Sequence, residues 1–263
     1  DVGLFTREID EASSCIKAGK IESSFMSHAD SLSNSIWLDK WLNELGVDYP
    51  ANSINTSSLK SSVFSKPSRD LNSIKIPELK KEISPIVFGC DNQINEVHAF
   101  AMFDYYYSKG GKVFDTAYIY NHGLSDKYLG DWINSRNLTD VVVLGKGAHT
   151  PDCFPDKIRP QIEESLLRGN IDKLDIYCLH RDNLDVPVNE FIDALNDCKN
   201  DGLINVLGAS NWELERFKSA NDYAYEQQKT GFKVLSNNFS LARMIEPVWP
   251  GCFSCDETYL KYL

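Results

Sequence analysis

Short apolar runs alternate with amphipathic stretches through most of the chain after residue 84. The apolar runs have the length of buried strands, and they cover 85–89, 111–115, 141–145, 174–179, 204–208 and 233–236. Between them, apolar residues at helical spacing predict helices near 93–109, 124–136, 156–169, 189–201 and 212–229. Strands and helices that alternate in this way indicate parallel βαβ units, so the sequence predicts an α/β protein.

Residues 1–50 show helical spacing and no strand-like run. A first helix is predicted from the spacing of Ile9, Ala12 and Ile16, and it ends at Gly19. A second helix is predicted after Ser31 and before Gly46. Its apolar stripe consists of Leu32, Ile36, Leu38, Trp41, Leu42 and Leu45. A segment of about 50 residues makes a marginal domain, so we expect another structure to cover this stripe.

A linker is predicted between these helices and the βαβ region. Residues 51–72 are rich in Ser and Asn, lack apolar periodicity and contain a proline near their end. Such a composition is typical of a connection between domains. The predicted organisation is therefore a helical segment at 1–50, a linker at 51–72 and an α/β domain at 73–263.

Four residues of complementary chemistry stand close to the ends of predicted strands. They are Asp115 and Tyr120 in FDTAYIY, Lys146 in VVVLGKGAH and His180 in LDIYCLHRD. A phenol has an ordinary pKa of about 10, so it donates a proton at neutral pH only with help from its surroundings. We expect Lys146 to favour the phenolate of Tyr120 and Asp115 to hold that lysine in place. His180 would orient a carbonyl oxygen, and the set would protonate an oxyanion as hydride arrives.

Each of these residues also has a structural interpretation when it is taken singly. Asp115 fits a strand-end cap, Lys146 a solvated loop lysine and His180 a histidine satisfied in the core. The joint pattern favours a proton-transfer site. His149, on the loop after Lys146, is either a substrate contact or a solvated histidine.

These motifs resemble those of the aldo-keto reductases over about 160 residues, from Ile83 to Leu241. The similar segments are SPIVFG at 84–89, GGKVFDTAYIYNHGLSDKYLGDWI at 110–133, KLDIYCLHRDN at 173–183 and INVLGASNW at 204–212. The resemblance implies a (β/α)8 TIM barrel with Asp115, Tyr120, Lys146 and His180 as its catalytic set. It also implies reduction of an aldehyde or ketone to an alcohol, with Tyr120 as the general acid.

The resemblance further implies a nicotinamide cofactor, NADP (NADPH) in the first place and NAD as the alternative. Ser210 and Asn211 match the Ser-Asn pair that binds the nicotinamide carboxamide. Ser236 is a third cofactor candidate, although the family often has a glutamine at that position. Asp126 stands where the family usually has a glutamate. No G-x-G-x-x-G motif occurs in the sequence to supply a second dinucleotide site.

The six predicted strands are fewer than the eight of a complete barrel, which takes about 250 residues. We therefore expect a barrel that is incomplete at its C-terminal side, in a reading frame that continues past Leu263. In the family, the NADP phosphates bind beyond strand seven, so we expect this chain alone to bind the cofactor weakly. Its open sheet edge would expose backbone hydrogen-bonding groups.

Residues 1–50 resemble the extreme C-terminus of the Gfo/Idh/MocA oxidoreductases. The similarity lies in E-x-x-x-C-I-x-A-G-K-x-E-S at 11–23, in the second helix and in GVDYP at 46–50. It implies that the segment is the tail of a preceding oxidoreductase domain in a fusion protein, with a Rossmann domain upstream of Asp1. A sugar-derived or polyol substrate is the expectation that follows from this resemblance.

Charge and composition exclude several other classes. The formal net charge of −11 would repel nucleic acid, and no basic run is present. No stretch approaches the roughly 18 consecutive apolar residues of a membrane span. The seven cysteines are scattered and odd in number, which is typical of reduced thiols in a cytoplasmic protein.

Metal binding is not predicted. Cys252 and Cys255 form a lone C-x-x-C without a second pair, and His180 has no neighbour at ligand spacing, so a metal-dependent hydrolase is disfavoured. The alternative that stays open is a non-catalytic regulatory or assembly module with the aldo-keto reductase fold. The serine at position 236 and the missing strands favour that alternative, whereas the four catalytic residues argue against it.

Overall fold

The computed structural model describes residues 6–46, 73–240, 244–247 and 249–263. The chain divides into two compact units, one that holds helices α1 and α2 and one that holds all later elements. Each unit is described by itself. The predicted linker at 51–72 lies outside the described residues. None of the described helices is both long and apolar enough to cross a bilayer.

The first unit contains α1 (Thr6–Lys17) and α2 (His28–Glu44). The second helix begins earlier than predicted, because Ser27 and Asp30 form a capping box at its N-terminus. The Ser27 hydroxyl accepts a hydrogen bond from the Asp30 N–H at 3.1 Å, and the Asp30 carboxylate accepts one from the Ser27 N–H at 2.9 Å. The prediction from Ser31 missed this turn.

The apolar residues of α2 are not buried within the first unit. Most of the predicted stripe is exposed to solvent, namely Leu32, Ile36, Leu38, Trp41 and Leu45, and so is Trp37 beside it. No described residue of α2 is fully buried. This agrees with the expectation that the two helices alone cannot bury so wide an apolar face.

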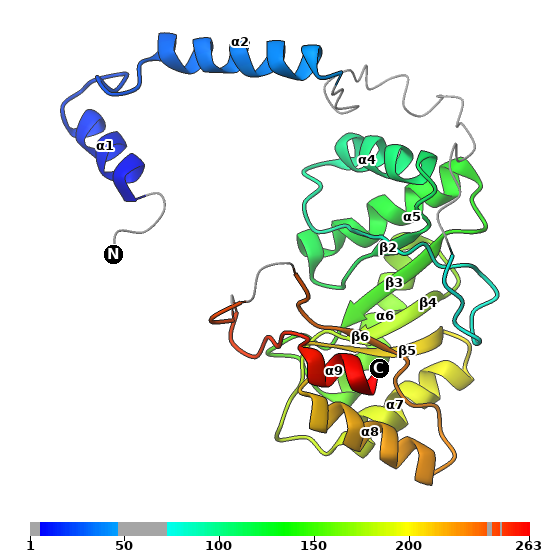
Figure 1. The fold of residues 1–263 in the computed structure, drawn as a ribbon. Coiled ribbons are helices and arrows are strands. Elements are labelled where there is room, and N and C mark those ends of the chain that lie inside the picture. The colour runs from blue at the N-terminus through cyan, green and yellow to red at the C-terminus, as the bar shows by residue number, and fades with distance from the viewer. Residues whose placement is uncertain (1–5, 47–72, 241–243, 248) are drawn as a thin grey trace. The chain divides into compact units, whose positions relative to one another are not determined.

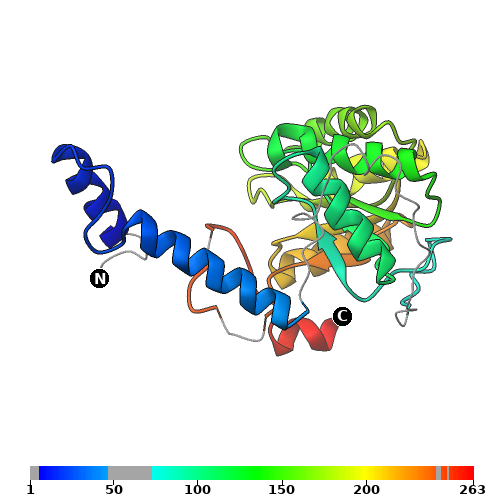
Figure 2. The same cartoon turned by 90° about the horizontal axis from the view of Figure 1, so that it is seen from above.

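The second unit is built on a six-stranded parallel sheet in which sequence order equals spatial order. The strands are β1 (Val87–Gly89), β2 (Val113–Asp115), β3 (Val142–Gly147), β4 (Leu174–Leu179), β5 (Ile204–Ser210) and β6 (Val234–Ser236). The sheet curls into a partial barrel, as Figures 1 and 2 show. The prediction of an α/β protein with an incomplete TIM barrel is confirmed.

Helices connect successive strands and lie on the outer face of the curled sheet (Figure 2). They are α4 (Glu96–Ser108), α5 (Leu124–Arg136), α6 (Pro155–Gly169), α7 (Val188–Asn200) and α8 (Leu214–Glu226). A short 3₁₀ segment, η2 (Tyr120–Gly123), precedes α5, and α9 (Glu257–Tyr262) follows β6. All five connecting helices were predicted, with ends that differ by only a few residues.

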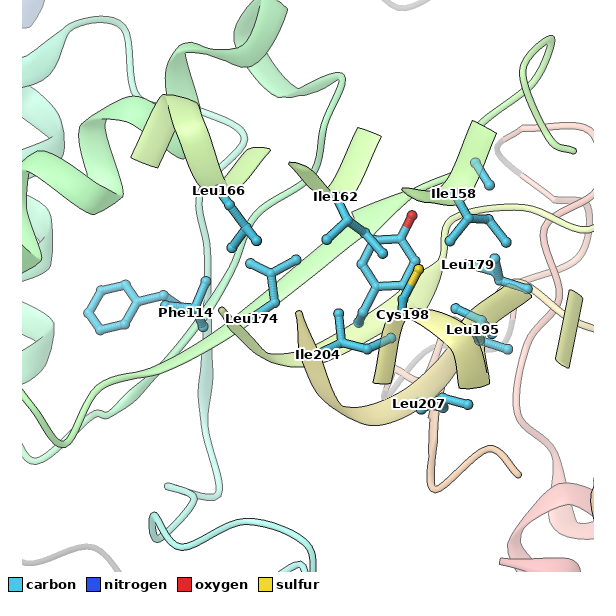
Figure 3. Close-up of a cluster of buried hydrophobic side chains, with 14 of the residues drawn as sticks. Phe114, Ile158, Ile162, Leu166, Leu174, Leu179, Leu195, Cys198, Ile204 and Leu207 are labelled. Carbon is cyan, nitrogen blue, oxygen red and sulfur yellow. The ribbon is translucent and has the colours of Figure 1, made fainter. Parts of the chain in front are cut away.

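The main hydrophobic core lies between the sheet and these helices. Figure 3 shows part of it, where side chains of β4 and β5 meet those of α6 and α7. Near β2, the fully buried Trp132 ring packs 4.9 Å from Phe114 and 5.5 Å from Phe103, measured between ring centroids. Its indole N–H donates to Asp104 at 2.7 Å, so the polar edge of the ring is satisfied.

A smaller core lines the inner face of the sheet. Leu79 and Ile83, which precede β1, pack there against inward-facing residues of β2 to β5. The antiparallel bridge between Ile74 and Ile83 fixes this preceding segment. The curled sheet is thus covered by apolar side chains on both faces, as a parallel sheet requires.

The contact between α5 and α6 gives a test of this packing. A methyl group added at Gly130 would lie 1.8 Å from the carbonyl oxygen of Gly169, which is backbone and cannot rotate away. Alanine gains about 1 kcal/mol over glycine in a helix interior, but overpacking against backbone costs more. We expect Gly130→Ala to lower the free energy of unfolding by about 2 kcal/mol or more.

The measurement is urea unfolding followed by near-UV circular dichroism, which reports on packed aromatic side chains. Gly89→Ala is the control, because a methyl group there meets nothing within 4 Å. Equal unfolding midpoints for the two variants would show that α5 and α6 do not pack as described.

Candidate active site

The carboxyl ends of the parallel strands surround an open cavity of about 910 Å³. All seven residues that the sequence predicted for the site line it, namely Asp115, Tyr120, Lys146, His180, Ser210, Asn211 and Ser236. Strand register explains the convergence, since Gly147 of β3 is level with Leu179 of β4, and Ser210 of β5 with Ser236 of β6. Ligand sites in barrels of this type lie at this end of the strands.

An ion pair joins the ends of β2 and β3. The Lys146 ammonium donates a hydrogen bond to Oδ1 of Asp115, and the lysine side chain is only 4% exposed. Burial lowers the pKa of Lys146 to about 8. The contact with the Asp115 carboxylate favours the charged form, so the pair keeps a cation at the floor of the cavity.

Tyr120 lies beside this pair, at the start of η2. The Lys146 nitrogen is over the phenol ring, 4.9 Å from its centroid. Burial raises the pKa of Tyr120 to about 12, and the carboxylate of Asp91 acts in the same direction. Loss of solvent is the largest effect on this phenol and favours its protonated form, and the expectation that Lys146 favours the phenolate stays a prediction. Tyr120 is a protonated phenol, the form that can donate a proton.

His180 directly follows β4 and is held by its backbone N–H, which donates to the Gly147 carbonyl at 2.7 Å. Its ring is perpendicular to the Tyr120 ring, with centroids 5.5 Å apart. Burial, reinforced by the charge of Lys146, lowers the pKa of His180 to about 2. The imidazole is neutral at physiological pH, and its buried Nδ1 has no hydrogen-bond partner among the described residues.

The three predicted cofactor residues form one hydrogen-bonded cluster at the ends of β5 and β6. The Ser210 hydroxyl donates to the Ser236 carbonyl at 2.9 Å, and the Asn211 side-chain amide donates to the Ser210 hydroxyl at 3.1 Å. Asn211 has a positive φ of 57°, a conformation that asparagine tolerates better than most residues. Ser236 takes part through its backbone, which does not depend on a particular side chain.

Asp126, where the family usually has glutamate, does not line the cavity. Its buried carboxylate accepts a hydrogen bond from the Thr116 hydroxyl at 2.7 Å and lies 3.8 Å from the Arg168 guanidinium. Burial raises the pKa of this carboxyl group. The residue anchors α5 to the segment that follows β2, so its contribution is to the framework of the site.

Sequence reasoning did not assign Asp91 and Asn237, although both line the cavity. Asp91 comes shortly after β1 and Asn237 directly after β6, so the rule that site residues follow strand ends would have found them. The Asn237 side chain accepts from the Trp212 N–H at 3.1 Å and donates to the Trp212 carbonyl at 2.8 Å. Trp212 itself is fully buried core, whereas Trp249 lines the cavity.

Residues next to the catalytic candidates in the sequence make contacts of their own. Asp182 does not pair with Arg181, because its carboxylate binds Arg216 at 2.8 Å. Arg181 lines the cavity. The Tyr118 hydroxyl donates to Glu164 at 2.8 Å, and this residue lies outside the cavity lining.

The model of the Aldo/keto reductase family matches residues 86–248, which is more than half of the chain. The chain therefore belongs to the aldo/keto reductase family. It is 27% identical over 191 residues to norsolorinic acid reductase B of Dothistroma septosporum, covering 63% of this chain and 48% of that protein. It is 26% identical over 168 residues to the putative aryl-alcohol dehydrogenase AAD14 of Saccharomyces cerevisiae, covering 58% and 45%.

Among solved structures, the glycerol dehydrogenase AKR11B4 from Gluconobacter oxydans is similar with a TM-score of 0.52. The sequences are 21% identical, and the match covers 57% of this chain and 51% of that one, so it supports the fold alone. The chain spans about half the length of the curated relatives it matches.

The buried neutral state of His180 predicts a loss of stability in acid. The unfolded chain takes up a proton at this histidine below about pH 6.5, whereas the folded chain does so only near pH 2. Its contribution is therefore fully present above pH 6.5 and falls as the pH is lowered. Between pH 7 and pH 5 we expect His180 to account for a loss of about 2 kcal/mol.

Urea unfolding at pH 7 and pH 5 measures this loss in the natural protein and in His180→Gln. The variant should lose about 2 kcal/mol less between the two pH values, because glutamine does not titrate. Other groups titrate equally in both proteins and cancel in the difference. The same pH dependence in both proteins would show that the His180 ring is accessible to protons in the folded state.

Proposed function

We propose that this protein catalyses the NAD(P)H-dependent reduction of an aldehyde or ketone to an alcohol, with Tyr120 as the general acid. The observation that carries the proposal is the convergence of an ion-paired lysine, a protonated phenol and a neutral imidazole in one cavity. Family membership supports an oxidoreductase that acts on carbonyl compounds.

The proton-transfer step follows from the states of these groups. The substrate oxygen gains negative charge as the carbonyl carbon is reduced, and Tyr120 gives its proton to that oxygen. The phenolate that remains is stabilised by the Lys146 ammonium, which Asp115 holds beside the ring. His180 is neutral and faces the same space, so it orients the carbonyl oxygen without competing as an acid.

The residues at the ends of β5 and β6 fit a nicotinamide group. Ser210 and Asn211 would hold its carboxamide, and the Ser236 carbonyl fixes the hydroxyl of Ser210. When bound, the cofactor supplies the hydride. The proposed cofactor is NADPH, and the alternative is NADH. A titration with each nucleotide distinguishes the two.

We also propose that residues 1–50 are the last helices of a Gfo/Idh/MocA-type oxidoreductase domain that is fused to the barrel. The exposed apolar side chains of α2 support this proposal, because they need a covering structure. All seven cysteines are free thiols, which supports a reducing, cytoplasmic location.

Tyr120→Phe tests the catalytic proposal in the full-length protein. We expect the rate constant kcat/KM to fall by about 10² to 10⁴, because only the proton donor is lost. The affinity for NADPH should not change. Tyr118→Phe is the matched control, since that hydroxyl binds Glu164 outside the cavity, and its activity should stay within about threefold of normal.

Rates are measured from the loss of nicotinamide absorbance with a panel of aldehydes and ketones. Full activity of Tyr120→Phe would contradict the role of this residue. A biological function that survives the substitution would favour the non-catalytic module instead.

Asn211→Asp tests the proposed nicotinamide site. The substitution keeps the size of the side chain and its tolerance of a positive φ, but it removes the amide hydrogen-bond donor. We expect the Kd for NADPH, measured by fluorescence titration, to rise about tenfold, which corresponds to one lost hydrogen bond. Asn137→Asp is the control, because Asn137 has a similar φ of 53° at the end of α5. Equal affinity of both variants would place the nicotinamide elsewhere.

A further inference from the structure

His149 lies next to the proton-transfer residues, and the mechanism above does not use it. It follows β3 by two residues, is half-buried and lines the same cavity as Tyr120 and His180. Its surroundings distinguish it from a solvated loop histidine.

The backbone before His149 is held in an unusual conformation. Ala148 is fully buried and has a positive φ of 54°, which costs energy for any residue with a β-carbon. Its N–H donates to the side-chain oxygen of Gln161 on α6 at 2.7 Å. After it, the Asp152 N–H donates to the His149 carbonyl at 2.8 Å and closes a turn.

This turn is fastened to the loop that follows β4. The Cys153 thiol donates to the Arg181 carbonyl at 3.2 Å, and the Asn183 side-chain amide donates to the Cys153 carbonyl at 3.1 Å. Hydrogen bonds of the residues before and after His149 therefore hold its backbone in place relative to the loop that carries His180.

His180 is in ring contact with both His149 and Tyr120 in this cavity. The His149 and His180 centroids are 4.8 Å apart with an interplanar angle of 77°, and the His180 and Tyr120 centroids are 5.5 Å apart. A substrate oxygen bound at His180 would therefore have His149 as a neighbour of the next carbon of the substrate.

One hydrogen bond determines what the His149 ring can offer. Its Nδ1 lies 2.8 Å from the Thr150 carbonyl oxygen, which can only accept. In the neutral ring Nδ1 therefore carries the hydrogen, and Nε2 is left as an acceptor. An acceptor recognises a hydroxyl or amine donor and gains nothing from an unsubstituted carbon chain.

We propose that His149 is a substrate-recognition residue whose Nε2 accepts a hydrogen bond from a hydroxyl group on the carbon next to the carbonyl. The inference rests on the proposed reductase function and narrows the substrate class to hydroxy-aldehydes and hydroxy-ketones. The rings of His149 and His180 are in contact, so two substrate oxygens bound by these rings would lie close together. Oxygens on adjacent carbon atoms of a substrate lie close together in the same way. The nearby carboxylate of Asp91 adds a further acceptor to the cavity lining.

Lactaldehyde and propanal are the probes, because they differ only by a hydroxyl on the carbon next to the aldehyde. The measurement is the ratio of kcat/KM for lactaldehyde to that for propanal. His149→Asn keeps a donor near the position of Nδ1 but removes the acceptor at Nε2, and we expect the ratio to fall about tenfold, as for one lost hydrogen bond. In His149→Gln the side-chain amide reaches the position of Nε2, and the ratio should recover to within about threefold of normal.

His122→Asn is the matched control, because His122 lies near Tyr120 but does not line the cavity. Its ratio should equal that of the natural protein. An unchanged ratio in His149→Asn, with propanal reduction that still depends on Tyr120, would overturn the inference and leave the reductase proposal intact. Failure of the natural protein to reduce lactaldehyde would also overturn the inference, and failure to reduce any compound of the carbonyl panel would overturn the reductase proposal as well.

Discussion

The structure of the barrel unit depends on one constraint, the parallel pairing of six strands in sequence order. Parallel strands point the same way, so all their carboxyl ends, and the residues that follow them, meet at one edge of the sheet. Asp115, Lys146, His180 and Ser210 are separated by 30 residues or more along the chain, yet they line one cavity for this reason. The helices on the outer face keep the strands in place through a continuous apolar core (Figure 3).

Burial then decides the charge states in the site. Loss of solvent lowers the pKa of Lys146 and of His180 and raises that of Tyr120. Each shift favours the uncharged form, and Lys146 is the group with an ion-pair partner in direct contact. The result is a neutral imidazole and a protonated phenol beside a lysine held by a carboxylate. A proton donor next to a cation that can stabilise its conjugate base is suited to giving a proton to an oxyanion.

Membership of the aldo/keto reductase family and the geometry of the cavity are independent observations, and they agree. The family match alone leaves the substrate open, because the relatives' names range from a norsolorinic acid reductase to aryl-alcohol dehydrogenases. The ring of His149, held by the turn that follows Ala148, is the feature from which we infer a class of substrate.

Local pattern in the sequence determined the elements and most of the site. Apolar runs and helical spacing located the six strands and five connecting helices, since burial and periodicity act over a few residues. The pattern of polar residues near strand ends pointed to Asp115, Tyr120, Lys146 and His180, and the resemblance to the aldo-keto reductases added Ser210, Asn211 and Ser236 as candidates. Tertiary structure alone decided what depends on contacts between distant segments. These features are the burial that raises the pKa of Tyr120 and the convergence of the strand-end residues on one cavity. The ring contact between His149 and His180 belongs with them, because desolvation and side-chain geometry arise only when segments far apart in the chain pack together.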